Sequence, residues 1–236
     1  TFKVTDDATN QEFNLINKQV FVSKKDTTGN DMKGAKLSVV AQDGSVVDTW
    51  VSDGTAHAVS NISVGATYKL REDEAPEGYV IATDVEFLVQ DDFTNQDVVM
   101  TDKQLFVSKK DVTGDDELPG AILTVTDVDG NEIDKWVSTD KAHAVKGLRA
   151  GVEYILTEVT APEGYAVAKS IRFTVNDDFA IQTVEMVDKQ VTVSKVDITG
   201  KEIPGATLTV TDKETGDVVD EWVSEETPHP IKNIAV

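Results

Sequence analysis

The chain has 236 residues with 43 acidic and 22 basic side chains, which gives a formal net charge of −21. Such an acid excess opposes binding to nucleic acid or to an anionic membrane surface, and it keeps a long chain soluble and self-repelling. The chain has no cysteine, so disulfides do not reinforce its fold, and no stretch has the length and hydropathy of a membrane span.

The sequence repeats itself with a period of 85 to 86 residues. The repeat is clearest in three aligned segments, VFVSKKDTTGNDMKGAKLSV (20–39), LFVSKKDVTGDDELPGAILTV (105–125) and VTVSKVDITGKEIPGATLTV (191–210). Residues 1–19 match the ends of the first two full copies, and the last copy stops before its second half. Self-similarity at this period predicts a string of small domains, and we expect the chain to be a window of a longer repetitive protein.

The repeat predicts two complete modules flanked by two partial ones. We place the C-terminal strands of a preceding module at 1–17, complete modules at 18–102 and 103–188, and the N-terminal part of a further module at 189–236. The linkers are short, because the sequence DKQ at 102–104 leads directly from the last strand of one module into the first strand of the next.

The local pattern is β throughout the chain. Short runs rich in Val, Ile, Thr, Phe and Tyr alternate with polar residues, and no segment has helical periodicity over three turns. Turn signals separate the runs, as in QDGS (42–45), APEGY (75–79), VDGN (128–131) and APEGY (161–165). Strands at this spacing predict an all-β fold, with each module an antiparallel β-sandwich in a linear array.

The first strand of each copy carries a lysine at the end of an apolar row. Side chains alternate between the two faces of a strand, so residues two apart share a face. Lys24 therefore shares a face with Val20 and Val22, and Lys109 and Lys195 stand at the same place in the later copies. Val196 replaces the second lysine in the third copy, which indicates that the first lysine of each pair points inward.

Acidic groups end two further apolar rows in each complete module. Tyr68 and Leu70 share a face with Glu72, and Val98 and Met100 share a face with Asp102. The second copy repeats both rows, which end in Glu158 and Asp188. In the leading fragment the row of Phe13 and Leu15 ends in Asn17. We therefore expect one lysine, one glutamate and one aspartate to face each module's own core.

Two forms of chemistry fit such a buried triad. One lysine beside two carboxylates can form a buried salt bridge in which one acid, its pKa raised by burial and by its like-charged neighbour, keeps a proton. Alternatively, a desolvated lysine amine can attack the neighbouring carbonyl carbon to form an amide, with the glutamate relaying protons. Asn17 at the acceptor position favours the covalent form, because amide formation needs a carbonyl carbon and not a charge.

These motifs resemble a known family. VSKKD (22–26, 107–111), the segments MKGAKLSV and LPGAILTV, and above all REDEAPEGY (71–79) and TEVTAPEGY (157–165) are similar to the B-type repeat domains of Gram-positive collagen adhesins and pilins, which are prealbumin-like, inverse-Ig sandwiches. The resemblance covers essentially the whole chain. It implies spontaneous intramolecular isopeptide bonds between the inward lysine and the Asn or Asp of the last strand, assisted by the glutamate.

Carried onto this chain, the resemblance joins Lys24 to Asp102 with Glu72 as the catalytic group, and Lys109 to Asp188 with Glu158. Asn17 and Lys195 are the counterparts in the incomplete modules, and each lacks its partners within the chain. The reaction is a single turnover of the protein on itself, so the resemblance implies no enzyme. It also implies no cofactor and an extracellular place on a Gram-positive cell wall.

Two other repeated features suggest a structural role. A histidine follows a tryptophan by seven residues in every copy, at His57, His143 and His229, and a single histidine per module does not predict a metal site. The acidic loop TDVDGNE (126–132) has a loose likeness to calcium loops, but the first copy has AQDGS there, so we expect no bound metal.

Three functions from different classes were compared. A structural stalk would use crosslinked modules in series to hold an adhesive head away from the cell, with neighbouring modules as partners and host ligands bound by other parts of the parent protein. The alternative makes the repeats themselves receptors for a host extracellular ligand. A glycosidase would use the paired carboxylates, but both acids face inward beside a lysine. The sequence therefore predicts the stalk.

Overall fold

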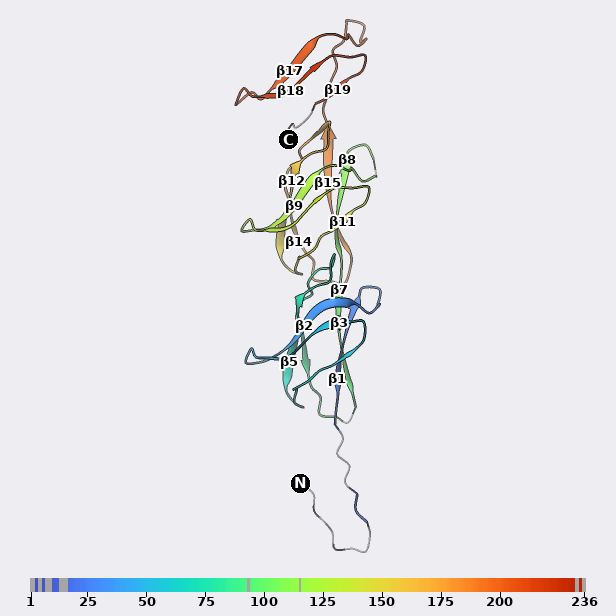
Figure 1. Cartoon of the computed structure of the whole chain (residues 1–236), viewed down its shortest axis with the longest axis vertical. Coiled ribbons are helices and arrows are strands. Elements are labelled where there is room, and N and C mark those ends of the chain that lie inside the picture. The colour runs from blue at the N-terminus through green and yellow to red at the C-terminus, as the bar shows by residue number, and fades with distance from the viewer. Residues whose placement is uncertain are drawn as a thin grey trace.

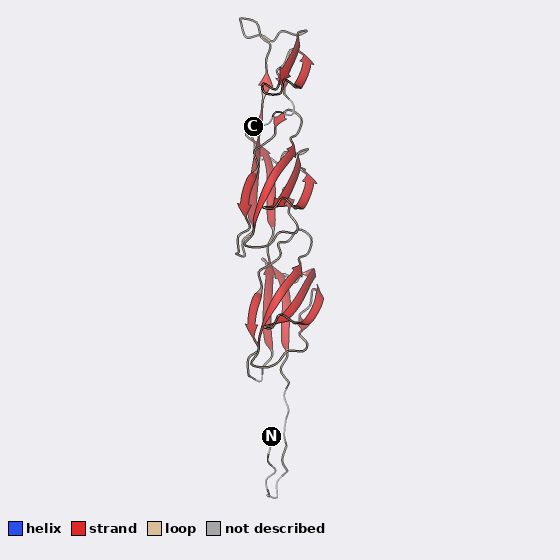
Figure 2. Ribbon diagram, turned by 90° about the vertical axis from the view of Figure 1, so that its left-hand side faces the viewer, coloured by secondary structure: helices blue, strands red, loops and turns tan. Residues whose placement is uncertain are grey.

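The structure is a computed structural model that describes residues 3, 6, 10–12, 17–92, 94–114, 116–231 and 234. Strands, turns and loops make up this part of the chain. Figures 1 and 2 show the strand-rich modules following one another along the long axis. The described residues contain no helix that is long and apolar enough to cross a membrane. The expected fold class, all-β sandwich modules in tandem, is confirmed.

Seven strands form the first complete module. They are β1 (Val20–Asp26), β2 (Lys33–Ala41), β3 (Val46–Asp53), β4 (His57–Ala58), β5 (Thr67–Glu74), β6 (Val85–Leu88) and β7 (Gln96–Asp102). One sheet has the strand order β4-β1-β7 and the other the order β3-β2-β5-β6. The inner faces of the two sheets supply the apolar core, because buried side chains alternate with partly buried or exposed ones along β1, β5 and β7.

The second module has the same plan with one additional short strand. Its strands are β8 (Leu105–Asp111), β9 (Ile122–Asp127), β10 (Glu132–Val137), β11 (His143–Ala144), β12 (Glu153–Thr160), β13 (Tyr165–Ala166), β14 (Ile171–Thr174) and β15 (Gln182–Gln190). The sheets have the orders β11-β8-β15-β13 and β10-β9-β12-β14. The repeat in sequence is therefore a repeat in structure.

The first and last strands of each module pair in parallel. Lys24 is in register with Met100, and Asp26 with Asp102; in the second module Lys109 is in register with Met186. The sequence predicts antiparallel sheets, and the other strand pairs of both modules are antiparallel. Strands that are neighbours in sequence can be joined by tight hairpins only when antiparallel, whereas β1 and β7 are separated by the whole module and have no such constraint.

The third copy contains two small sheets. Strand β16 (Thr192–Val193) pairs with β19 (His229–Pro230), and β17 (Thr207–Thr211) pairs with β18 (Val218–Val223). These pairings correspond to those of β1 with β4 and of β2 with β3 in the first module. The expected strands of residues 1–17 fall largely outside the described residues, and so do Phe13 and Leu15 of the leading apolar row.

Candidate functional site

A lysine, a glutamate and an aspartate meet in the core of the first module. They come from three strands: Lys24 from β1, Glu72 from β5 and Asp102 from β7. The lysine side chain is 1% exposed, and both acidic side chains are 0% exposed. Lys24 Nζ lies 3.1 Å from Glu72 Oε1 and is in contact with Asp102 Oδ1. The structure thus brings together the three residues that the sequence predicts.

The register of the strands explains this meeting. Lys24 is opposite Met100 on the parallel neighbour strand, and Asp102 lies two residues further along β7 on the same face. Glu72 belongs to the other sheet and faces the pair across the core. Apolar side chains of the same rows surround the triad, and Val22, Leu70 and Met100 are each no more than 1% exposed. The groups therefore interact in a nearly water-free environment.

The second module repeats the same triad with the same geometry. Lys109 on β8 has its Nζ 3.4 Å from Oε1 of Glu158 on β12, and it is in contact with Oδ1 of Asp188 on β15. The lysine is 1% exposed as a side chain and the two acids are 0% exposed. Strand parity and register are the same in both modules, and so is the buried arrangement. The fold itself therefore positions the three side chains.

A backbone amide fixes each glutamate, and this contact was not predicted from the sequence. The N–H of Ala82 donates to Glu72 Oε2 at 2.8 Å, and the N–H of Ala168 donates to Glu158 Oε2 at 2.6 Å. The other carboxyl oxygen, Oε1, is left to face the lysine. Because a backbone donor has no sequence signature, only the recurring position ten residues after each glutamate could have indicated it.

Burial raises the pKa of one carboxyl group in each triad. In the first module burial raises the pKa of Asp102 to about 8, with Lys24 opposing the rise and the charge of Glu72 adding to it. In the second module burial raises the pKa of Glu158, and the Ala168 amide and Lys109 oppose that rise. A carboxyl with a raised pKa in each triad agrees with the charge count, because two carboxylates and one ammonium would leave a buried net charge.

The aspartates are incompletely hydrogen-bonded. Within the described residues, Oδ2 of Asp102 and Oδ2 of Asp188 are buried and accept no hydrogen bond. A stable buried ion pair normally satisfies its remaining lone pairs with further hydrogen bonds. These carboxyl groups therefore lack the surroundings that would stabilise them as permanent carboxylates, while each carbonyl carbon lies beside an amine.

The second lysine of each pair lies at the surface. Lys25 pairs with Asp31 at 2.7 Å, and Lys110 pairs with Glu185 at 3.3 Å. Their side chains are 32% and 23% exposed, whereas the neighbouring Lys24 and Lys109 are buried. The structure thus agrees with the inward assignment that strand parity and the third copy suggest.

The counterparts in the incomplete copies lie outside any triad. Asn17 is exposed, just before β1. Lys195 is partly exposed and follows β16, and the chain contains no third-copy equivalent of Glu158 or Asp188. Neither residue therefore has a reaction partner in the part of the chain that the structure describes.

The recurring histidine is part of a repeated structural contact. His57 stacks on Trp50 with ring centroids 4.0 Å apart, and its Nε2 lies 3.0 Å from Asp48 Oδ2. Burial acts to raise the pKa of Asp48, but hydrogen bonds from the Ser60 N–H and from His57 outweigh it, so the pKa is lowered. The contact joins β4 of one sheet to β3 of the other. The same pairs recur at His143 and Asp134 and at His229 and Asp220.

The sequence gives a signal for this contact that the histidine alone does not reveal. An aspartate stands two residues before the tryptophan in every copy, so the repeated unit is Asp-x-Trp followed by His.

Among the described residues, no group of three or more His, Cys, Asp or Glu side chains could hold a metal ion. In the loop with a likeness to calcium sites, Asp127 accepts hydrogen bonds from Asn131 and Asp129 of its own turn.

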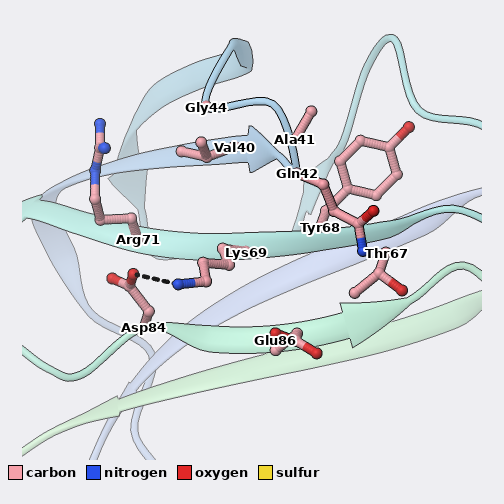
Figure 3. A pocket seen from close by; sticks show the side chains of 10 residues that line it. All are labelled: Val40, Ala41, Gln42, Gly44, Thr67, Tyr68, Lys69, Arg71, Asp84 and Glu86. Carbon is pink, nitrogen blue, oxygen red and sulfur yellow. Dashed lines mark ion pairs between the residues drawn. The ribbon is translucent and has the colours of Figure 1, made fainter.

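A surface groove of about 520 Å³ lies beside β5 and β6 of the first module. Figure 3 shows Lys69 and Asp84 paired along it, with Arg71 at one end and Tyr68 at the other. The aligned positions of the second module are Ile155 for Lys69 and Ser170 for Asp84. The charges of the groove are therefore not a repeated feature, unlike the triad.

The chain has similarity to solved structures and to one protein-family model. No protein with a curated description matches the chain. Among solved structures, the Bacillus anthracis TIE protein is 22% identical with a TM-score of 0.33, over 91% of this chain and 43% of that one. The shaft pilin SpaA of Lactobacillus rhamnosus GG is 14% identical with a TM-score of 0.34, over 75% of this chain and 98% of that one.

A streptococcal ancillary pilin is 22% identical with a TM-score of 0.35, over 74% of this chain and 62% of that one. The chain thus spans less than half of the TIE protein and under two thirds of the ancillary pilin. The model of the SpaA prealbumin-like fold domain matches twice, at residues 18–104 and 103–190. These two matches cover most of the chain, which therefore belongs to the SpaA prealbumin-like fold domain family.

Proposed function

We propose that the chain is part of the structural stalk of a Gram-positive surface adhesin or pilus-like protein, and that an isopeptide bond locks each complete module. The modules are residues 18–102 and 103–188, with partial modules at 1–17 and 189–236. The observation that carries the proposal is the pairing of a buried lysine amine with a buried aspartate carboxyl beside a glutamate, which occurs in both complete modules.

The reaction needs only the three side chains. The neutral amine of Lys24 attacks Cγ of the protonated Asp102, and Glu72 receives a proton from the amine and delivers one to the departing oxygen. A bond forms between Nζ and Cγ, one C–O bond breaks, and one water leaves. In the second module Lys109 attacks Cγ of Asp188, Glu158 supplies a proton to the departing oxygen, and the amine supplies the other, so that one water leaves there as well. Confinement within one folded core supplies the high effective concentration that replaces external activation.

The state of the buried groups supports the covalent form over a permanent salt bridge. A protonated carboxyl is a better acceptor than a carboxylate, and the raised pKa of Asp102 keeps it protonated at neutral pH. The amine is the nucleophilic form of a lysine side chain. Bond formation then converts the amine and the carboxyl into an uncharged amide, so that neither group can be left as a costly buried charge.

The position of the bond suits a stalk under tension. The chain enters the first module at the start of β1 and leaves it at the end of β7, and these strands are parallel neighbours. A bond from Lys24 to Asp102 carries the pulling force from one strand directly to the other. The residues between them, 25–101, are therefore removed from the path of the force. In a chain without cysteine, such bonds give small modules the reinforcement that disulfides give elsewhere.

The proposal makes the chain a structural protein at the outside of the cell and not an enzyme, because each triad reacts once with itself. A receptor role for the repeats is the weaker candidate. The charged residues of the groove in the first module are not repeated at the aligned positions of the second, whereas a set of receptor repeats would share its binding residues. Host ligands are then bound by other parts of the parent protein.

Peptide mapping by mass spectrometry tests where the bonds lie. Digestion with trypsin is expected to yield branched peptides in which the β8 segment around Lys109 is joined to the β15 segment around Asp188, with the mass of one water missing. The β1 and β7 segments should be joined likewise through Lys24 and Asp102. Recovery of these segments only as separate linear peptides of full mass would contradict the proposal.

Crosslink formation in the first module is expected to slow as the pH rises through about 8, because Asp102 has its pKa raised to about 8 by burial. In the unfolded chain an aspartate loses its proton near pH 4. The proton bound by folded Asp102 thus stabilises the uncrosslinked fold fully below about pH 4, and this contribution is lost as the pH rises through about 8. Above about pH 8, Asp102 is a carboxylate, which is a poor acceptor for the attack of the lysine amine.

The measurement is the rate of water loss from freshly translated chain, followed by mass spectrometry in buffers between pH 6 and pH 9.5. Near-ultraviolet circular dichroism serves as the control that the modules stay folded across this range. A rate that rises steadily through pH 8 would show instead that deprotonation of the lysine limits the reaction, and would contradict the assigned role of the protonated aspartate.

A further inference from the structure

Val80 belongs to the first module by sequence but packs in the core of the second. It is 1% exposed, and it lies in one cluster of buried side chains with Leu105, Val107, Val145 and Leu148. The core cluster of the first module does not contain it. The apolar core of the second module is thus completed by a side chain that the preceding module supplies.

The backbone around Val80 is bonded to the following module as well. The N–H of Ile81 donates to the Leu148 carbonyl at 2.8 Å, and the N–H of Ala150 donates to the Ile81 carbonyl at 3.2 Å. Ile81 and Arg149 form an isolated parallel β-bridge. The N–H of Val80 donates to the carbonyl of Lys103 in the linker at 3.0 Å. We call residues 79–83 the connector.

An ion pair fixes the linker to the following module. Lys103 is the residue after Asp102, and its Nζ lies 2.9 Å from Asp178 Oδ1 in the second module. The lysine side chain is only 4% exposed, whereas the Asp178 side chain is 49% exposed, so the pair holds a buried lysine to the surface of the second module. The hydroxyl of Thr83 adds a hydrogen bond of 3.2 Å to the neighbouring Asp177.

The connector is also held by its own module. The N–H of Ala82 donates to Glu72, whose side chain is fully buried in the triad of the first module. Val80 packs in the core of the second module, and Ala82, only two residues further along, is hydrogen-bonded to the buried triad of the first. Such a segment has little freedom to act as a hinge, because both of its ends are fixed by buried contacts.

The joint recurs between the second module and the third copy. Ala166 and Ile231, the equivalents of Val80 and Val145, are each 1% exposed, and the N–H of Val167 donates to the Ile234 carbonyl at 2.6 Å. Gly164 has a φ of +87°, and a Cβ there would lie 2.9 Å from Cβ of Pro230. The two joints have matching contacts, which indicates that the interface between modules is a repeated feature of the fold.

We propose that each connector is an interaction surface whose partner is the next module of the same chain, so that every module completes the core of the one that follows it. The modules then keep one fixed relation to each other, and the stability of each depends on its neighbour, as in other repeat proteins with nearest-neighbour interfaces. This proposal does not depend on the isopeptide bonds, because it rests on packing between modules.

Val80→Asp in the full chain tests the proposal through hydrogen exchange followed by mass spectrometry. The substitution places a charge in the second core, so amides of β8, β9 and β12 are expected to exchange at least tenfold faster than in the unchanged chain. Amides of β2 and β5, in the module that carries the mutation, should change much less. Val99→Asp is the matched control, because Val99 is 47% exposed on β7 of the same module and should affect neither core.

The opposite pattern would overturn the proposal. Faster exchange confined to the first module, or no change in either module, would show that Val80 is not part of the second core. A charge exchange gives a separate test of the joint: Lys103→Asp and Asp178→Lys should each broaden the distribution of molecular dimensions in small-angle X-ray scattering, and the double variant should restore it. Equal scattering from all four chains would contradict a fixed joint.

Discussion

Replacing Lys24 with methionine is expected to lower the unfolding temperature of the first module by about 20–35 °C, since a domain of this size shifts by about 4–8 °C for each kcal/mol lost. The proposed bond from Lys24 to Asp102 would close a loop that spans 78 residues. Constraining the unfolded chain over such a loop is worth about 4.5 kcal/mol on the chain-entropy model. Methionine keeps most of the buried volume of the lysine, so that no large cavity adds to the loss.

Lys25→Met provides the matched control for this experiment. Lys25 is the next residue on β1, carries the same charge and pairs with Asp31 at the surface, where an ion pair contributes little. Its replacement should leave the unfolding temperature within a few degrees, measured by differential scanning calorimetry. A small shift in the Lys24 variant, equal to that of the Lys25 variant, would contradict a covalent bond at Lys24.

The sequence predicts the core of the site because strand parity is a local property. Lys24, Glu72 and Asp102 each end a row of apolar side chains two residues apart, and the strands around them form as the alternation indicates. The repeat then gives a second, independent row for each residue. Burial of all three side chains follows from the pattern, although the sequence alone leaves open whether the buried groups form an ion pair or a bond.

Other parts of the site depend on contacts between distant segments and could not be read from a local pattern. The parallel pairing of β1 with β7 brings Asp102 diagonally next to Lys24, and nothing in either strand specifies its partner or its direction. The backbone N–H of Ala82 has no sequence signature at all. Asp48 was missed as the partner of His57, although an aspartate recurs at that position in every copy.

The sequence repeat does not indicate the contact between neighbouring modules. A period of 85 to 86 residues divides the chain into units, and Val80 falls well inside the first of them. The natural expectation is that an apolar residue packs in its own unit. Its place in the second core arises because the segment after β5 reaches beyond the end of β7, which only the three-dimensional arrangement of neighbouring modules reveals.

Glu158→Ala is expected to abolish the crosslink of the second module and leave that of the first. Without the glutamate, Lys109 loses the group that is positioned to take its proton and to deliver one to the leaving oxygen. The variant chain should lack the mass of one water instead of two, after correction for the substitution. Glu185→Ala is the control, because Glu185 lies on β15 but its side chain is 51% exposed and outside the triad.

Loss of both bonds in the Glu158 variant, or of neither, would contradict a separate glutamate in each module. The proposed mechanism keeps the two reactions chemically independent, since the first module contains its own complete triad of Lys24, Glu72 and Asp102. Tandem mass spectrometry of the digested variant identifies which bond remains, and the branched peptide through Lys24 should be the one recovered.

Intact mass spectrometry of the unchanged, fully denatured chain tests the central claim most directly. Each isopeptide bond releases one water, and denaturation breaks ion pairs but not amides. We predict a mass that is lower than that calculated from the 236 residues by two water molecules, one each for the Lys24–Asp102 and Lys109–Asp188 bonds. A chain of full, undiminished mass would contradict the account and would leave two buried ion pairs in place of the crosslinks.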